Sequence, residues 1–233
     1  MKKSKLLGSV GVVTAAALAL VACGKSGNDN SGASEAKKFP AATPKKAVKQ
    51  GGTVNVALES DTPFTGIFSD ELQTVSSDSE AAAPGNESLF DTDDHYKINN
   101  KGAATMKLDR ANKTVTITVK KGVKWADGKQ VNAKDLEYPY EILANKKTQA
   151  QRYSSQLEEI EGMKEYHEGK ANKISGIEMP DGENGRTIVI HFKEMKPGMD
   201  YSGNGYFWEA AAPYHYLKDV PFNKLQSSDQ IRK

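Results

Sequence analysis

The sequence predicts an α+β body in which a mixed sheet and hairpins are flanked by helices, with a disordered N-terminal tether before it. Three observations support this fold class. Apolar residues alternate with period two in several short segments, helical periodicity occurs in separate segments between them, and no regular βαβ order emerges. The 233 residues, 37% hydrophobic and 27% charged, exclude collagen-like, wholly disordered and polytopic membrane proteins.

The first 22 residues have the order of an export signal. Lys2, Lys3 and Lys5 precede an uncharged run from Leu6 to Ala22 that ends in small residues. The alternative is a transmembrane anchor, but glycine, serine, threonine and alanine dilute a run that is at the lower limit for crossing a bilayer. We therefore predict a signal peptide over 1–22.

The order Leu20-Val21-Ala22-Cys23 resembles the lipobox of bacterial lipoproteins, in which a diacylglyceryl group is attached to the cysteine. Cys23 is the single cysteine of the chain. Two acyl chains, such as palmitate, anchor a protein stably without a spanning helix. The resemblance implies a lipid-anchored, extracytoplasmic protein on the outer face of the cell membrane. A buried structural cysteine is the alternative.

Residues 23–50 are predicted to be a lipid-anchored flexible linker. They are rich in Gly, Ser, Asn, Ala, Lys and Pro and bury too little apolar surface to offset their ordering entropy. A coil of this length has a reach of about 30 Å. Removal of the signal leaves the chain close to neutral, which argues against a nucleic-acid partner.

The folded body is predicted to span 51–233 and to begin with a strand over 53–58, where Val54, Val56 and Leu58 share one face. A polar loop follows. No regular periodicity is found from there to about Asn100, a stretch that has no Lys or Arg before Tyr96 but ten carboxylates. We expect an acidic, irregular segment here.

A hairpin is predicted next, with strands over 103–108 and 113–119 and a short polar connection between them. In the second strand apolar residues alternate with threonines, which predicts one buried and one exposed face. The buried residues are expected to be Val115, Ile117 and Val119.

Two helices are predicted after an Asp127-Gly128 turn. Asn132 is the N-cap of the first, which places Leu136, Tyr140 and Leu143 on one face, and Pro139 predicts a kink or irregular turn. The second starts near Thr148 with Gln151 in capping-box position and runs through Tyr153, Leu157 and Ile160 towards Met163.

A second strand pair is predicted over 174–179 and 187–193, around the turn-rich linker 180–185. Ile188, Ile190 and Phe192 are expected to face the same way.

No set of residues supports catalysis. H-E-x-x-H, G-x-S-x-G, Walker and G-x-G-x-x-G patterns are all missing. The cluster over 91–94 suggests calcium, but the required Gly and Glu positions are occupied by Tyr96 and Gly102, so we expect an acidic loop and no metal. His95, His167, His191 and His215 share no ligand spacing. The sequence predicts neither an enzyme nor a cofactor.

One segment resembles a known family. Residues 123–138, VKWADGKQVNAKDLEY, resemble the signature of the solute-binding proteins that feed peptide ABC transporters, family 5. Further segments look like the oligopeptide-binding lipoproteins of streptococcal and lactococcal type, so that the resemblance covers nearly the whole chain: 51–57, 174–177, 180–185, 192–199 and 202–207.

The resemblance implies part of a type II periplasmic-binding-protein-like lobe. Because family members are more than twice as long and close two lobes over a peptide, we expect an amino-terminal fragment without the second lobe and with weak or absent peptide affinity. The implied function is an oligopeptide-binding component of an ABC importer, monomeric and without catalysis, that captures peptides and delivers them to permease subunits. A surface receptor or adhesin without transport, using the acidic segment, is the alternative.

The loop after the first strand lies at the cleft in this family. The resemblance therefore implies peptide contacts from Glu59, Ser60, Asp61, Thr62, Pro63 and Phe64, and an ordinary polar turn is the alternative. Trp125 and Trp208 are expected in the core rather than at a pocket.

Overall fold

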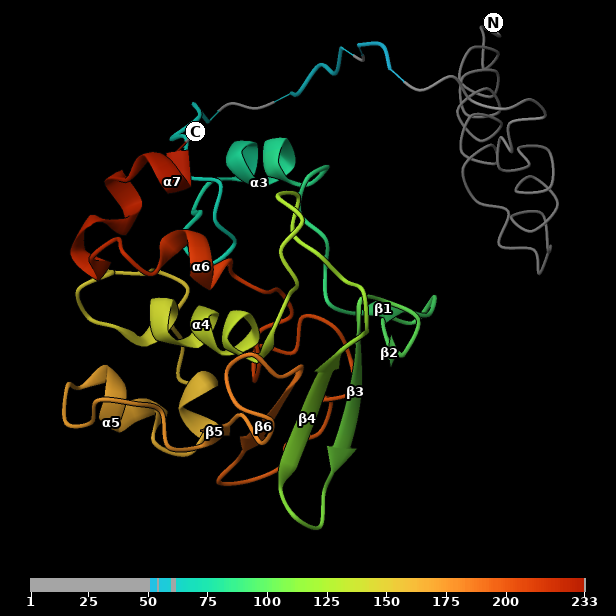
Figure 1. Cartoon of the computed structure of the whole chain (residues 1–233), viewed down its shortest axis with the longest axis vertical. Helices are drawn as coiled ribbons and strands as arrows, with labels where there is room; N and C mark the ends of the chain where they lie inside the picture. The colour runs from blue at the N-terminus through green and yellow to red at the C-terminus, as the bar shows by residue number, and fades with distance from the viewer. Residues whose placement is uncertain (1–50, 54, 60–61, 233) are drawn as a thin grey trace, which may run out of the picture. The chain divides into compact units, whose positions relative to one another are not determined.

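The computed structural model describes residues 51–53, 55–59 and 62–232. The predicted signal peptide, the lipobox with Cys23 and the linker 23–50 lie outside these residues, as do Val54, Ser60 and Asp61. The chain divides into two units, Met1–Asn55 and Val56–Lys233. The second unit contains the described helices and strands (Figure 1).

A four-stranded antiparallel sheet forms one side of this unit. Its order is β3 (Ala104–Asp109), β4 (Thr114–Val119), β6 (Thr187–His191) and β5 (Ile177–Glu178). The β3–β4 hairpin confirms the prediction from alternation. Strands β1 (Asp91–Thr92) and β2 (Ile98–Asn99) pair separately.

The buried face of the sheet is the predicted one. Val115 lies opposite Ile190 and Ile117 opposite Ile188, and all four side chains are inaccessible to solvent. Phe192 continues this face beyond β6 and is equally buried. Cross-strand pairs of branched side chains are the units that stabilise a sheet. The alternation of threonine with apolar residues therefore predicted the buried face correctly.

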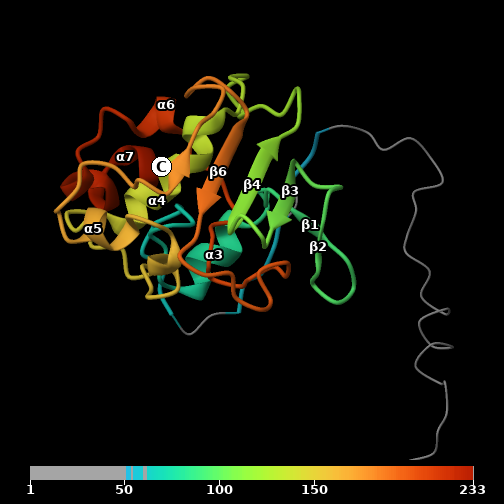
Figure 2. The same cartoon turned by 90° about the horizontal axis from the view of Figure 1, so that it is seen from below.

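Helix α4 (Ala133–Ala144) lies at the centre of the unit, between α5 (Met163–His167) and α6 (Tyr214–Leu217), beside the sheet (Figures 1 and 2). The predicted N-cap is confirmed. The Asn132 side chain accepts the Asp135 N–H at 3.1 Å, and the Asp135 carboxylate accepts the Asn132 N–H at 3.0 Å. This reciprocal capping box satisfies two donors that a helix start leaves unpaired.

Pro139 lies inside α4 without interrupting it. Proline removes the N–H that would have bonded to the carbonyl of Asp135. The Ala212 N–H donates to that carbonyl instead, at 3.0 Å. The helix therefore continues without the irregular turn that was the second form of the prediction, because a segment distant in sequence supplies the missing donor.

The remaining elements are short. Helix α3 spans Ser76–Ala82 and α7 spans Asp229–Arg232, and two 3-10 turns cover Leu157–Glu159 and Phe222–Ser227. Helix α3 lies in the segment for which the sequence indicated no regular element. Among the described residues, no helix has the length and hydropathy needed to traverse a bilayer.

Two predicted elements are wrong. The described residues of 53–58 form no strand, and Val56 and Leu58 are 73% and 39% exposed, because no described strand pairs with them. The helix from Thr148 to Met163 is replaced by turns and a 3-10 segment. Gly162, with φ +74°, lies outside the helical region and precedes α5, and a side chain at this position would meet Ser175. The strand expected over 174–179 is reduced to β5.

Two clusters of buried side chains share α4. Leu136, Tyr140 and Leu143 pack with the sheet, as predicted from their spacing. Tyr138 and Ile142, on another face of the helix, pack with the C-terminal segments. Since both clusters depend on one helix, the unit has a continuous core around α4.

Candidate functional site

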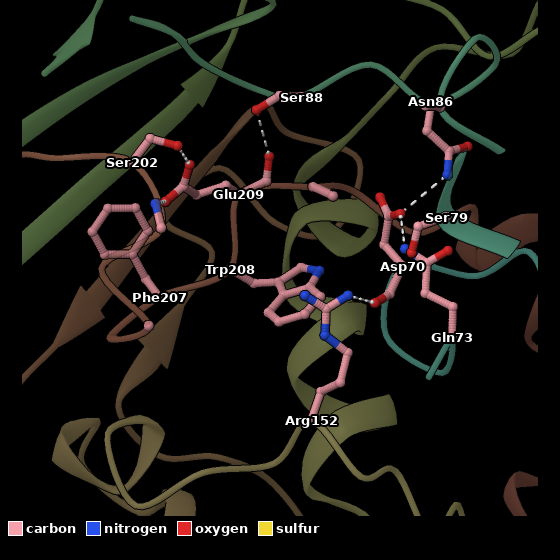
Figure 3. A pocket seen from close by; sticks show the side chains of 14 residues that line it. Asp70, Gln73, Ser79, Asn86, Ser88, Arg152, Ser202, Phe207, Trp208 and Glu209 are labelled. Atoms are coloured by element: carbon pink, nitrogen blue, oxygen red, sulfur yellow. Dashed lines mark hydrogen bonds between the residues drawn. The ribbon is translucent and has the colours of Figure 1, made fainter. Parts of the chain in front are cut away.

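An open pocket with a volume of about 490 Å³ lies where three segments distant in sequence meet (Figure 3). One segment contains α3 and the turns on either side of it, the second contributes Arg152, and the third follows β6. The lining residues are Asp70, Gln73, Ser79, Ala83, Asn86, Ser88, Arg152, Ser202, Gly203, Gly205, Phe207, Trp208, Glu209 and Ala210.

Arg152 and Trp208 form one wall. The guanidinium carbon of Arg152 lies 4.8 Å from the centre of the indole ring, and one guanidinium N–H donates to the Asp70 carbonyl at 2.6 Å. The Trp208 backbone N–H donates to the Tyr140 hydroxyl of α4 at 2.9 Å. The core helix therefore positions the backbone that carries this wall, and the stacked cation holds the ring.

Asp70 forms the facing part of the lining together with two amides. One of its oxygens, Oδ1, accepts the side-chain N–H groups of Gln73 and Asn86, each at 3.1 Å. These two bonds orient the Asp70 carboxylate, and their donors come from residues before and after α3 in the sequence.

The second carboxylate of the pocket, Glu209, is fully engaged by the protein. Its two oxygens accept the Ser202 hydroxyl at 2.6 Å and the Gly203 N–H at 2.7 Å. Its backbone carbonyl accepts the Leu89 N–H at 2.9 Å. Glu209 thus closes the 202–209 loop and joins it to the segment before β1.

Beside the pocket, Glu71 is a buried carboxyl with 3% exposure. Burial raises the pKa of Glu71 to about 7. Hydrogen bonds from the Ser69 hydroxyl and from the backbone of Glu71 itself lower this pKa, but burial has the larger effect. The indole of Trp208 also lowers the pKa of Glu71, as a hydrogen-bond donor does. Gln73 Oε1 and Ser77 Oγ have no hydrogen-bond partner in the described part of the chain. Unsatisfied buried polar atoms concentrate where a structure binds water or a ligand.

Asp78 fixes the segment before the pocket. It is fully buried in α3, and its carboxylate accepts the N–H groups of Thr65, Gly66 and Ile67 as well as the Thr65 hydroxyl. Burial alone raises the pKa of Asp78, but these hydrogen bonds outweigh it and hold the pKa below its usual value. Asp78 therefore remains charged and anchors the chain to α3.

The described residues among those that the family resemblance implied do not line this pocket. Glu59, Pro63 and Phe64 are exposed, and Thr62 is half-buried. Their role in peptide contact stays a prediction. Both tryptophans pack against the core without being fully buried, and Trp208 also lines the pocket, contrary to expectation.

Sequence reasoning missed the residues that define the pocket. The sequence places Asp70 among the ten carboxylates of the acidic segment and predicts a helix over Arg152 that does not form. No periodicity or spacing connects positions 82 residues apart, such as Asp70 and Arg152. The lack of basic residues between Gln50 and Tyr96 was the one available signal.

The described residues contain no group of three or more His, Cys, Asp or Glu side chains suited to a metal. In the acidic loop, Asp93 accepts the N–H groups of His95 and Lys97 and so forms a turn. His167 stacks on Tyr153 with ring centres 3.9 Å apart. His215 lies 3.0 Å from Asp127. These contacts give the side chains of His167 and His215 partners within the fold.

Comparison with protein families and with curated proteins identifies what this chain is similar to. Residues 97–230 match the family model described as bacterial extracellular solute-binding proteins, family 5 middle. The oligopeptide-binding protein OppA of Lactococcus lactis subsp. cremoris (strain SK11) is 44% identical over 237 residues, which cover 98% of this chain. The chain spans 39% of the length of that relative.

Solved structures show the same likeness. Lactococcal OppA complexed with an endogenous peptide in the closed conformation matches with a TM-score of 0.73 and 46% identity, over 75% of this chain and 33% of that one. The oligopeptide-binding protein AppA of Bacillus subtilis, in complex with a nonapeptide, matches with a TM-score of 0.55 and 21% identity, over 72% of this chain and 29% of that one. The fold is therefore part of a type II periplasmic-binding-protein-like architecture.

Proposed function

Because the chain belongs to family 5 of the bacterial extracellular solute-binding proteins, we propose that it takes part in oligopeptide capture for an ABC importer. The observation that carries this proposal is its 44% identity, over 98% of its length, to a lactococcal oligopeptide-binding protein. The chain acts without catalysis and as a monomer. It presents peptides to membrane-embedded permease subunits.

The residues that line the pocket offer the hydrogen-bonding groups that one wall of a peptide-binding cleft needs. An extended peptide offers backbone N–H and C=O groups, and the pocket offers carboxylate and amide oxygens beside the N–H groups of Arg152. Binding through backbone groups with roomy side-chain space tolerates many peptide sequences. Closure of a second lobe over this wall, a hinge motion, would retain the peptide.

Titration of the isotope-labelled chain with short oligopeptides tests peptide capture. We expect the indole N–H resonance of Trp208 to shift, because this ring lines the pocket. The indole N–H of Trp125 donates to the Asp135 carboxylate at 3.0 Å, and Trp125 is not among the residues that line the pocket. Its resonance is the internal control and should not shift. Peptides that leave the Trp208 resonance unchanged at millimolar concentration contradict the proposal. Micromolar or tighter binding contradicts the expectation that a second lobe is needed.

We also propose that a diacylglyceryl group on Cys23 anchors the protein to the outer face of the membrane. The lipobox residues Leu20, Val21 and Ala22 and the single cysteine support this assignment. Expression in a bacterium should place the wild-type chain in the membrane fraction, with mass spectrometry showing cleavage before Cys23 and an added lipid. The variant Cys23→Ser should lose the lipid. A free thiol on a chain that retains residue 1 would contradict the anchor.

A further inference from the structure

We propose that Asn184 is a site of spontaneous deamidation, at which the chain exchanges a side-chain amide for a carboxylate without the help of an enzyme. Asn184 precedes Gly185 in the turn 180–185 between β5 and β6. The main-chain nitrogen that follows an asparagine can attack its side-chain amide, and glycine favours this attack because it has no Cβ to shield the nitrogen. The reaction belongs to the chain itself and is independent of peptide capture.

The reaction requires only water as a co-reactant. The nitrogen of Gly185 gives its proton to hydroxide and forms a bond to Cγ of Asn184. The bond from Cγ to Nδ2 breaks, and the leaving nitrogen takes a proton from water and departs as ammonia. The succinimide ring that remains takes up one water molecule. Hydrolysis at Cγ gives aspartate, whereas hydrolysis at the main-chain carbonyl gives isoaspartate, whose main chain runs through the former side chain.

The described residues contain two Asn-Gly pairs, and their asparagine side chains differ in how firmly they are held. Asn184 is exposed, and its amide forms no hydrogen bond within the described part of the chain. At Asn204, which precedes Gly205, Nδ2 donates to the Tyr201 carbonyl and Oδ1 accepts the Tyr206 N–H, each at 2.8 Å. Ring closure at Asn204 has to break both bonds. The structure therefore favours reaction at Asn184.

The turn itself requires the glycine that makes Asn184 reactive. A Cβ at position 185 would lie 2.6 Å from Cβ of Asp181 and 2.9 Å from the carbonyl oxygens of Asp181 and Gly182. The Gly185 N–H donates to the Gly182 carbonyl at 2.9 Å, and this one bond must open before the nitrogen can attack. Bonds in exposed turns open at low free-energy cost. The residue that permits the turn is thus also the one that permits the reaction.

The carbonyls on either side of Asn184 hold the start of α4. The Ala133 N–H donates to the Gly185 carbonyl at 2.8 Å, and the Lys134 N–H donates to the Glu183 carbonyl at 3.1 Å. These are N–H groups for which a helix has no partner of its own. Isoaspartate lengthens the main chain between the two carbonyls by one methylene, so both cannot keep their positions. Aspartate leaves the main chain unchanged and places a negative charge near the helix N-terminus, which the helix dipole favours.

The rates at the two asparagines test the proposal within one sample. The full chain, purified in mild detergent, is kept in mildly alkaline buffer with and without urea, and its peptides are followed by mass spectrometry. In the folded chain we expect Asn184 to convert at least about 10-fold faster than Asn204, because only Asn204 must release two side-chain hydrogen bonds. Urea should bring the two rates together. Enzymatic methylation of isoaspartate separates this product from aspartate.

Amide hydrogen exchange tests the consequence for α4. In aged wild-type chain the isoaspartate form should exchange the amides of Ala133 and Lys134 about 10-fold faster than the fresh chain does. The matched control Asn184→Gln keeps an amide at this position but closes a ring much more slowly, and its exchange should not change on ageing. Freshly prepared Asn184→Asp, which adds the charge without lengthening the main chain, should exchange no faster than fresh wild type.

Conversion of Asn204 at the same rate as Asn184, or faster, in the folded chain overturns the site. A rate difference that persists unchanged in urea overturns its structural cause. Exchange at Ala133 and Lys134 that is the same in fresh chain and in the isoaspartate form overturns the link to α4, as does faster exchange in aged Asn184→Gln. All of these outcomes leave peptide capture intact, because its test is the Trp208 resonance.

Discussion

At the scale of single residues, buried carboxyl groups in one short segment determine how the pocket region behaves. Asp78 and Glu71 are only seven positions apart, and both are almost inaccessible to solvent. Four hydrogen bonds lower the pKa of Asp78, whereas burial raises the pKa of Glu71 to about 7. The same residue class thus supplies an anchor in one place and a group that titrates near neutrality in the other.

The variant Asp78→Ala should destabilise the fold by about 3 kcal/mol at neutral pH, because it leaves the N–H groups of residues 65–67 without their charged acceptor. Urea unfolding followed by circular dichroism measures this loss. The exposed control Asp94→Ala should change stability by less than about 0.5 kcal/mol.

The cost of Asp78→Ala should also depend on pH. Since the folded pKa of Asp78 is depressed, its stabilising effect is present above the ordinary value of 3.8 and is lost as the pH falls through the folded pKa. A cost that stays constant on acidification would contradict the role of the charged carboxylate.

Glu71 should make the fold less stable as the pH rises from 4.5 towards 7 and above. Its folded pKa is raised, so the folded state holds its proton more tightly than the unfolded state, and this advantage is lost on deprotonation. The variant Glu71→Gln should remove about 2–3 kcal/mol of this decline. Thermal unfolding across this range measures it, with the exposed Glu87→Gln as control. Identical pH profiles for wild type and Glu71→Gln would contradict the assignment.

At the scale of elements, helix α4 depends on both local and distant contacts: local ones start the helix, and distant ones connect it to the rest of the fold. Its start is local, because Asn132 and Asp135 cap each other three residues apart. The same capping residue Asp135 also makes contacts with residues outside the helix. The buried Asp135 carboxylate also accepts the Trp125 indole N–H at 3.0 Å and the Tyr214 N–H at 2.9 Å, so it joins the preceding turn and α6 to the helix.

Substitution at the two capping residues should therefore have unequal costs. Asn132→Ala loses a cap and should cost about 1 kcal/mol. Asp135→Ala leaves three N–H donors without a partner and should cost about 3 kcal/mol or more. Chemical denaturation of the two variants gives the comparison. Equal costs would show that Asp135 acts only as a cap.

At the scale of the whole molecule, α4 joins two buried clusters into one core. Leu136 and Leu143 belong to the cluster under the sheet, and Ile142 belongs to the cluster under the C-terminal segments. Because the two sets project from the same helix, neither cluster can lose its packing without disturbing the other. We expect the described unit from Val56 onwards to unfold cooperatively.

The variants Leu136→Ala and Ile142→Ala test this expectation, one for each cluster. Each side chain is at most 1% exposed, so each truncation should cost about 3 kcal/mol. Both should lower the midpoint of one shared transition, seen alike by far-ultraviolet circular dichroism and tryptophan fluorescence. Two separate transitions, with each variant affecting only one of them, would contradict a continuous core.

The sequence alone determined those features whose causes lie within a few residues. Alternation predicted the β3–β4 hairpin and the buried face of β6, and Asn132 predicted the start of α4. The resemblance of residues 123–138 predicted the family that the comparisons then showed. Each of these signals is a spacing or short motif that the chain carries by itself.

Only the tertiary structure decided the continuity of α4 and the composition of the pocket. Pro139 is tolerated because Ala212 supplies a donor, and Ser175 lies so close to Gly162 that a side chain there would meet it. Asp70, Arg152 and Trp208 meet although no local pattern relates them. A contact between distant segments depends on how the intervening elements pack, and this packing leaves no periodic trace in the sequence.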